Sequence, residues 1–257
     1  MLRILRPEFR VTTLFRITPV VDPNEPARDS VNRPAELKSF FGISIVFLVL
    51  LFFGFTIFFH LLYYSNSKPG QWYANFIKQG HNPVRWLEYA ISAGIMSLII
   101  CLISGVREIN GTWAVVLSIA SLMIQGAIVE RQLILPTPDL TTVKYATLAG
   151  WTLLLTAWTP IAFTLLNVIK DIRDNPQYTN RVPAWIPLFT FFQLFQFAVF
   201  GFVQLKQVRA LLNRAVLPAF QDIERSYIIN SFSTKLVLGS FIAYGLLDRQ
   251  RRSDDWR

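Results

Sequence analysis

The chain has 257 residues, of which 53% are hydrophobic and only 16% are charged, and it contains 22 Phe and 7 Trp. This composition is too apolar and too aromatic for an ordinary soluble domain of that length, and it indicates a protein whose solvent is lipid. The formal charge of +9 comes mostly from Arg and Lys at the ends of apolar runs and in the tails. Because this distribution is typical of headgroup anchors, we do not expect nucleic acid as a partner.

The cysteine and histidine content restricts covalent and metal chemistry. Cys101 is the single cysteine and lies in an apolar run, so a disulfide within the chain and a cysteine-based zinc cluster are excluded. We expect Cys101 to fill the core. The two histidines, His60 and His81, give poor support for a haem or a multi-histidine metal site. We predict neither a metal site nor an enzymatic activity.

Residues 1–39 form a first segment that we predict to lie outside the membrane. Its arginines break every apolar run before it reaches the length of a signal-peptide core, so the segment is not a cleavable signal. Its prolines leave no room for a membrane span of proper length. The stretch VTTLFRITPVV (residues 11–21) alternates β-branched and other residues, which indicates a short strand or a hairpin.

Six apolar runs follow, and each has the roughly 17–25 residues that a transmembrane helix requires. The predicted spans are residues 41–64, 85–104, 112–129, 145–169, 184–205 and 226–247. A polar connection rich in Asn, Gly, Lys and Pro joins the first two spans. Residues 206–225 are amphipathic and charged, which predicts a helix extension followed by a loop that breaks near Pro218.

The predicted fold class is therefore an all-α transmembrane helix bundle. The bundle occupies residues 40–247, and a basic C-terminal tail follows over residues 248–257. The sequence predicts six spans in this bundle.

Lys235 is the tenth of the 22 residues in the last span, about 15 Å from either end at helical rise, so its side chain cannot reach water. A lysine at mid-membrane costs about 2.5–3.5 kcal/mol on insertion scales, and ionisable groups at that depth are usually functional. Loss of hydration favours the neutral amine, which can attack an aldehyde and form a Schiff base. The alternative is a lysine that pairs with a carboxylate or lines a water-filled cavity.

The residues around Lys235 favour a bound chromophore. Ser231 lies one helical turn before the lysine, and Gly239 lies one turn after it, where a bulky ligand needs room. Tyr227 lies one turn before Ser231, so these residues form a stripe along one face of the helix. The spacing therefore favours a bulky chromophore, held on Lys235 as a protonated Schiff base.

Glu88, Ser92 and Met96 form a similar stripe on the second span. A protonated Schiff base in a low dielectric needs an anion nearby, and Glu88 is the acidic residue that lies inside a span and not at its border. We therefore predict that Glu88 is the counterion. An ion pair between Glu88 and Arg85, three residues earlier, is the alternative.

Aromatic and amide side chains supply the remaining candidates for a pocket. Trp158 and five phenylalanines of the fifth span could wall a slot for a long conjugated ligand, although a Phe-rich span is more often lipid-facing. These phenylalanines are Phe191, Phe192, Phe195, Phe197 and Phe200. Lipid penalises amide groups, so we expect four glutamines to face inward: Gln125, Gln193, Gln196 and Gln204. His60 is most simply an interior hydrogen-bonding group, and a proton acceptor only if a cavity connects it to the Schiff base.

Two segments on separate spans resemble the heliorhodopsin family. RWLEYAISAGIM (residues 85–96) is similar to the third-helix signature of that family, and ERSYIINSFSTK (residues 224–235) is similar to its retinal-lysine helix. The resemblance extends over most of the chain from about residue 40 onward. It implies that Lys235 carries all-trans retinal and that Glu88 is its counterion, with Ser92 and Ser231 near the Schiff base.

The resemblance also implies roles for residues farther from the lysine. Six residues fall where the family lines or borders its retinal pocket: Met96, Met123, Gly126, Trp158, Phe197 and Gln204. His60 matches a cytoplasmic-side histidine that takes part in proton movement, so it is the candidate proton acceptor. Arg225 and Glu130 match family positions to which we assign no role. The family also suggests a homodimer.

The sequence departs from the family at its start. The resemblance implies that the six predicted spans belong to a seven-helix, rhodopsin-like fold. The first span of this chain aligns with the second helix of the family. We therefore expect a member that lacks the first transmembrane helix, with residues 1–39 corresponding to the connection after it, where the family forms strands. A histidine that the family carries on that helix is absent as well.

These observations predict a retinal-binding, light-sensing protein of the lipid bilayer, a photoreceptor that signals to an unknown partner and does not pump ions. One alternative is a light-gated proton-conducting channel. A second, from a different class, is a membrane scaffold or small-molecule carrier that kept the fold and lost the pigment.

Overall fold

The computed structural model describes residues 8–14, 37–64, 68–106, 108–174, 185–213 and 219–254. These residues form two strands and seven helices. The strands are β1 (Glu8–Leu14) and β2 (Leu37–Ser44). The helices are α1 (Ile45–Tyr64), α2 (Lys68–Lys78), α3 (Pro83–Ser104), α4 (Ile109–Leu133), α5 (Leu140–Asp174), α6 (Trp185–Leu212) and α7 (Phe220–Asp254).

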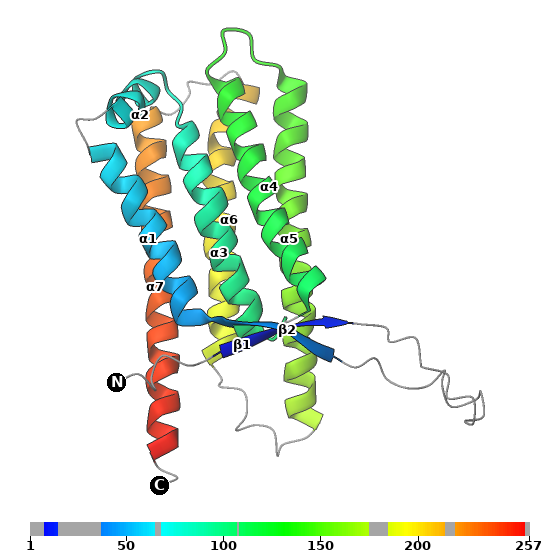
Figure 1. The fold of residues 1–257 in the computed structure, drawn as a ribbon. Coiled ribbons are helices and arrows are strands. Elements are labelled where there is room, and N and C mark those ends of the chain that lie inside the picture. Colours follow the sequence, from blue (N-terminus) through cyan, green and yellow to red (C-terminus); the bar gives the residue numbers. More distant parts are fainter. Residues whose placement is uncertain are drawn as a thin grey trace, which may run out of the picture.

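The six long helices lie side by side and alternate in direction, while the short α2 lies at one end of the bundle and the strands at the other (Figure 1). Five helices of the described chain are long and apolar enough to cross a membrane: α1, α3, α4, α5 and α6. Large apolar side chains, such as Phe47, Leu155 and Leu188, are exposed on their outer faces, as expected where the neighbour is lipid. The prediction of an all-α transmembrane bundle is confirmed.

The helix α7 contains the sixth predicted span but does not belong to this apolar group. Its 35 residues give it the length to cross a bilayer, at about 1.5 Å per residue. Its composition is more polar, because a run from Asn230 to Lys235 carries amide, hydroxyl and amine groups near its middle. These polar groups of α7 are what the rest of the bundle must accommodate.

The central element of the bundle is α3. Its most apolar stretch is 67% buried inside the protein, compared with 22–33% for α1, α4, α5 and α6. The helix begins at Pro83, where the side chain of Asn82 accepts a hydrogen bond of 3.1 Å from the backbone N–H of Arg85. It ends at Gly105, whose φ of +94° is the left-handed conformation that glycine adopts readily. A polar side chain on α3 is therefore surrounded by other helices.

Three tryptophans pack against glycines of neighbouring helices and set close helix spacing. A Cβ added at Gly126 of α4 would lie 2.3 Å from the ring of Trp86 on α3. The same relation joins Gly201 of α6 to Trp151 of α5, at 2.9 Å, and Gly245 of α7 to Trp185 of α6, at 2.8 Å. Because only glycine leaves room for the rings, these contacts fix the spacing of α3 to α4, of α5 to α6 and of α6 to α7.

The two strands form an antiparallel hairpin in which Glu8 pairs with Ser44 and Leu14 pairs with Leu37. The predicted strand over residues 11–21 is confirmed as far as Leu14, and its remainder lies outside the described residues. The run from Phe41, which we expected to begin the first span, still belongs to β2 up to Ser44. The helix therefore begins at Ile45, because the backbone of residues 41–44 is hydrogen-bonded to β1.

The segment between the first two spans is the clearest difference from the sequence-based expectation. We expected a polar connection, whereas Lys68–Lys78 forms the amphipathic helix α2. It exposes Trp72 and turns Tyr73 toward α1, where the two rings of Tyr63 and Tyr73 stack with centroids 4.2 Å apart. One aromatic contact thus docks α2 onto the bundle.

The last two helices are longer than the predicted spans. The expected helix extension after residue 205 is confirmed, since α6 continues to Leu212, and the predicted break near Pro218 lies outside the described residues. At the other end, α7 continues through most of the predicted C-terminal tail, up to Asp254.

We predict that Gly126→Ala destabilises the protein. The added methyl group collides with the rigid, buried ring of Trp86, and overpacking of this kind usually costs about 1–3 kcal/mol. The unfolding midpoint in detergent should fall. The matched control is Gly54→Ala on α1, since nothing lies within 4 Å of its added Cβ. Equal midpoints for wild type and Gly126→Ala would contradict this account of the packing.

Candidate functional site

The site is centred on an ion pair between the middle of α7 and the first half of α3. The Nζ atom of Lys235 lies 3.0 Å from Oε1 of Glu88. Both side chains are buried, with only 4% and 2% of their surface exposed. Two opposite charges at this distance, shielded from water, stabilise each other far more than a surface pair does. The pair therefore joins α7 to α3 at the depth where lipid would otherwise oppose both charges.

The second oxygen of the Glu88 carboxylate is also satisfied. The hydroxyl of Tyr63, from the last turn of α1, donates a hydrogen bond of 3.2 Å to Oε2. Tyr63 in turn is held by its stacking on Tyr73 of α2. The carboxylate thus accepts one donor on each oxygen, and the two donors come from different helices. Its orientation is fixed by α1 and α7 together.

The alternative ion pair between Glu88 and Arg85 is not formed. Arg85 donates instead to Glu130 of α4 through Nη2 and to Glu224 of α7 through Nη1. Its guanidinium also lies 4.2 Å from the ring centre of Tyr227. Since both of its terminal nitrogens are already engaged by carboxylates, Arg85 leaves Glu88 to Lys235.

The second cluster, formed by Asn82, Arg85, Glu130 and Glu224, was missed by the sequence analysis. The backbone N–H of Asn82 donates to Glu130 at 2.5 Å, and its side-chain amide donates to Glu224 at 2.8 Å. All four side chains are buried. The signal in the sequence was three charged residues at span borders, positions normally occupied by solvated anchors. The cluster joins the start of α3, the end of α4 and the start of α7 at one end of the bundle.

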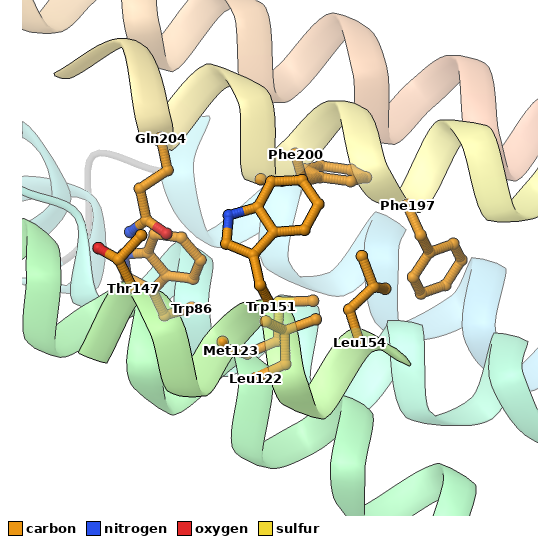
Figure 2. Close-up of a pocket in the computed structure, with 11 residues that line it drawn as sticks. Trp86, Leu122, Met123, Thr147, Trp151, Leu154, Phe197, Phe200 and Gln204 are labelled. Carbon is orange, nitrogen blue, oxygen red and sulfur yellow. The ribbon is translucent and has the colours of Figure 1, made fainter. Parts of the chain in front are cut away.

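Residues from the two predicted stripes, on α3 and on α7, line one cleft together with Lys235. A cleft of about 20 Å³ brings Lys235 together with several predicted pocket residues. They are Ser92, Met96, Met123, Phe197 and Ser231. A second cleft of about 40 Å³ adds Gln204, which lies beside the rings of Trp86 and Trp151 (Figure 2).

Two further predicted pocket residues lie behind the walls of these clefts. Trp158 packs edge-on against Phe197, with ring centroids 5.8 Å apart. Gly126 lies beneath the ring of Trp86, and its carbonyl oxygen accepts a hydrogen bond of 2.9 Å from the Gln204 amide. These two residues position the wall, and the side chains in front of them form its surface.

Some sequence-based expectations about this region are wrong. Phe191, Phe192 and Phe195 are 44–60% exposed on the outside of α6, so they face lipid and do not wall a slot. The physical reason is helical periodicity, which among these five phenylalanines turns Phe197 fully and Phe200 partly inward. The space predicted above Gly239 is also filled, since the ring of Phe53 would lie 3.1 Å from a Cβ at that position.

The inward-facing amides are confirmed for Gln193 and Gln196, which are 0% and 4% exposed. The Gln193 amide donates to the backbone oxygen of Thr234 at 3.4 Å, and the Gln196 amide donates to Ser233 at 3.2 Å. These bonds connect α6 to the two residues of α7 that come directly before Lys235. Gln125 is half-buried. Cys101 is fully buried in the core, as expected of a filling residue.

A cavity with a volume of about 730 Å³ lies between α1 and α7. Lys235, Glu88 and Tyr63 line it, and so do Arg85 and Glu224 of the second cluster. His60 lines it too, but its side chain is exposed, and its Nδ1 pairs with the backbone oxygen of Thr56 at 2.8 Å. The simpler expectation, an interior hydrogen-bonding histidine, is therefore wrong about burial. The cavity required for the proton-acceptor hypothesis does connect His60 with the ion pair.

His81 lies at the cluster end of the bundle, between α2 and α3. Partial burial, helped by the nearby positive charge of Arg131, holds the pKa of His81 below its usual range, although Glu130 opposes the shift. Its ring packs on Phe76 of α2, with centroids 5.2 Å apart. We assign this histidine to the packing of α2.

Comparison with known proteins agrees with this geometry. A family model described as Heliorhodopsin matches residues 10–247, which include both α3 and the part of α7 that carries Lys235. A search of curated proteins gave no match. Heliorhodopsins are seven-helix, retinal-binding rhodopsins that sense light. The chain therefore belongs to the heliorhodopsin family, as an integral, multi-pass membrane protein that binds retinal.

Proposed function

We propose that this protein is a photoreceptor in which Lys235 binds all-trans retinal as a protonated Schiff base and Glu88 is the counterion. The observation that carries the proposal is the buried contact of 3.0 Å between Nζ and Oε1. Among the described residues, Lys235 is the lysine that is buried at mid-helix. A positive nitrogen there requires one negative charge nearby, and Glu88 supplies it.

The side chains of the region fit a conjugated, apolar aldehyde. The amine that would hold it is Lys235, and the walls beyond it are methionine and aromatic side chains. The two clefts, of about 20 and 40 Å³, are narrower than a polyene requires, so their walls must separate when it binds. Met96 and Met123 are suited to this, because unbranched thioether side chains rearrange easily. Retinal, when bound, supplies the visible absorption and a double bond that isomerises in light.

The side chains of the protein supply charge near the Schiff base and orient the polar groups around it. Ser92 and Ser231 place hydroxyl groups in the same cleft as Lys235, where each can donate to or accept from a polar atom. Glu88, held by Tyr63, defines where the positive charge is most stable. His60 is the candidate acceptor for a proton that leaves Glu88 along the cavity, because both line it.

We further propose signalling as the output, in which a change at the ion pair shifts the bundle between two states that a partner reads. The cavity that connects Lys235, Glu88 and Glu224 favours a second candidate, light-gated proton conduction, because it brings titratable groups into one space. Light-driven currents in voltage-clamped cells separate the two functions.

We expect Lys235→Ala to form no pigment. Purified wild-type protein mixed with all-trans retinal should develop a visible absorption band, and the variant should develop none, since it lacks the amine. Lys144→Ala is the matched control, because that lysine is exposed on α5. A visible band in Lys235→Ala, or none in wild type, would refute the proposed function. Absence in wild type would favour the pigment-less scaffold.

The counterion role predicts the behaviour of Glu88→Gln. Loss of the negative charge should move the band to longer wavelength. The visible band should also disappear at a pH about 1–3 units lower than in wild type, the range typical for removing one opposite charge at close distance. Glu88→Asp, which keeps the charge, should show a smaller change. A Glu88→Gln pigment with an unchanged pH titration would assign the counterion elsewhere.

Tyr63→Phe tests the hydrogen bond that Tyr63 donates to Glu88. The variant keeps the ring that stacks on Tyr73 and removes one donor to the carboxylate, so the Glu88 anion is less stable. The absorption maximum of the variant pigment should therefore differ from that of wild type. Tyr145→Phe, at an exposed position of α5, should leave the maximum in place. A lower unfolding midpoint without a shifted absorption maximum would make Tyr63 a packing residue only.

A further inference from the structure

We infer that the end of the bundle where α2 lies binds anionic lipid headgroups through exposed cations on α4, α5 and α6. These cations, which we call the basic collar, are Arg131, Lys144, Lys206 and Arg209. The partner is the layer of phosphate-bearing headgroups in the adjoining leaflet of the bilayer. The inference is independent of the pigment, because other residues line the clefts beside Lys235.

The three helix ends that carry the basic collar are packed together by one small apolar cluster. The buried members of this cluster are Val129 of α4, Val143 and Ala146 of α5, and Val208 of α6. The connection between α4 and α5 lies at the same end of the bundle as α2 (Figure 1). Lys144 and Arg209 directly follow two cluster residues in the sequence and are exposed, because successive helical residues point in different directions.

The cations of α6 continue a lipid-facing stripe of that helix. Phe195 and Phe202 are 60% and 55% exposed and lie seven residues apart on its outer face. Lys206 and Arg209 follow Phe202 by four and seven residues, so they lie on the same face, nearer the helix end. Positive side chains that end an apolar stripe are typical of the headgroup layer.

The same pattern occurs on α4 and α5. On α4, Ile124 and Ile128 are exposed apolar residues, and Arg131 follows Ile128 by three residues. On α5, Lys144 precedes Leu148, which is 63% exposed, by four residues. In each helix the cation shares the outer face of the apolar residue and lies closer to the end of the bundle. Three neighbouring helices thus place positive charge at similar depth.

The acidic residues at this end leave the basic collar in excess. Glu130 and Glu224 are buried and bound to Arg85, so their charges are compensated inside the bundle. Among the described side chains there, the exposed acidic residues are Asp139 and Asp222. The surface around α4, α5 and α6 therefore has a positive potential, which attracts anionic lipid.

The strand end of the bundle has a more balanced charge. Among the side chains that the structure describes at that end, the exposed cations are Lys170 and Arg173 of α5. Arg173 pairs with Asp174 at 3.2 Å, and Glu108 adds another negative charge at the start of α4. The attraction for anionic lipid should therefore be concentrated in one leaflet.

The position of the cations favours lipid over a soluble anion. Lys and Arg have long apolar stems, so they can cover hydrocarbon while their charged groups reach the phosphates. Tyr145, next to Lys144, is 69% exposed and adds an amphipathic ring of the kind enriched at the membrane interface. A phosphate that belongs to a lipid is already held at this depth, whereas a soluble anion would have to approach a face covered by lipid.

The experiment measures which lipids remain next to the protein. The full chain is reconstituted in phosphatidylcholine vesicles with a trace of spin-labelled lipid, and electron paramagnetic resonance gives the immobilised fraction. Labelled phosphatidylglycerol should associate about threefold more strongly than labelled phosphatidylcholine at low salt, and high salt should reduce this preference. Equal association of the two lipids at low salt would overturn the inference.

Two double variants separate the basic collar from the overall charge of the protein. Lys144→Gln with Lys206→Gln should abolish most of the preference, whereas Lys170→Gln with Arg173→Gln should retain most of it. Both doubles remove two exposed cations and change the net charge equally. Equal losses in the two doubles would refute a localised site.

A variant that keeps the charges guards against effects on folding. Lys144→Arg with Lys206→Arg should preserve both the unfolding midpoint and the lipid preference, since either cation attracts a phosphate. Loss of the preference in this folded variant would contradict recognition by charge.

The source of the phosphate is tested with salts of equal ionic strength. Sodium phosphate and sodium chloride should reduce the preference for phosphatidylglycerol to the same extent, because both act by screening. A stronger effect of phosphate would assign the basic collar to a soluble phosphate ligand and overturn the assignment to lipid.

Discussion

The ion pair of Lys235 and Glu88 constrains every element around it. Neither charge can remain in the bilayer interior without the other, so the face of α7 that carries Lys235 must meet the face of α3 that carries Glu88. Once those faces meet, Tyr63 of α1 completes the carboxylate, and Tyr73 of α2 stacks on Tyr63. The position of four helices follows from one contact of 3.0 Å.

A second charged cluster keeps the first pair electrically separate. Arg85 and Glu88 are three residues apart on α3 and would be natural partners, yet Arg85 is engaged by Glu130 and Glu224. Both terminal nitrogens of the Arg85 guanidinium are occupied within its own cluster. Glu88 is therefore left to pair with the nitrogen of Lys235 and not with Arg85.

The sequence predicts those features that depend on one helix at a time. Apolar length locates the spans, and depth within a span identifies Lys235 and Glu88, because lipid penalises charge wherever the helix packs. Features that depend on contacts between several segments cannot be predicted in this way. Glu130 and Glu224 look like interfacial anchors until the fold brings them to Arg85. The end of β2, from Phe41 to Ser44, looks like part of a span until β1 pairs with it, and α2 is too short and polar for a hydropathy signal.

The two sides of Lys235 differ in stiffness, and this difference has a mechanical consequence. On one side, tryptophan rings rest on glycines at distances that permit no closer approach, so α3 to α6 behave as a rigid wall. On the other side lies a cavity of about 730 Å³, which leaves space between α1 and α7. A displacement that arises at the lysine therefore meets fewer packed side chains toward this cavity. Tyr63, which contacts both Glu88 and Tyr73, connects the ion pair to α2 at the end of the bundle.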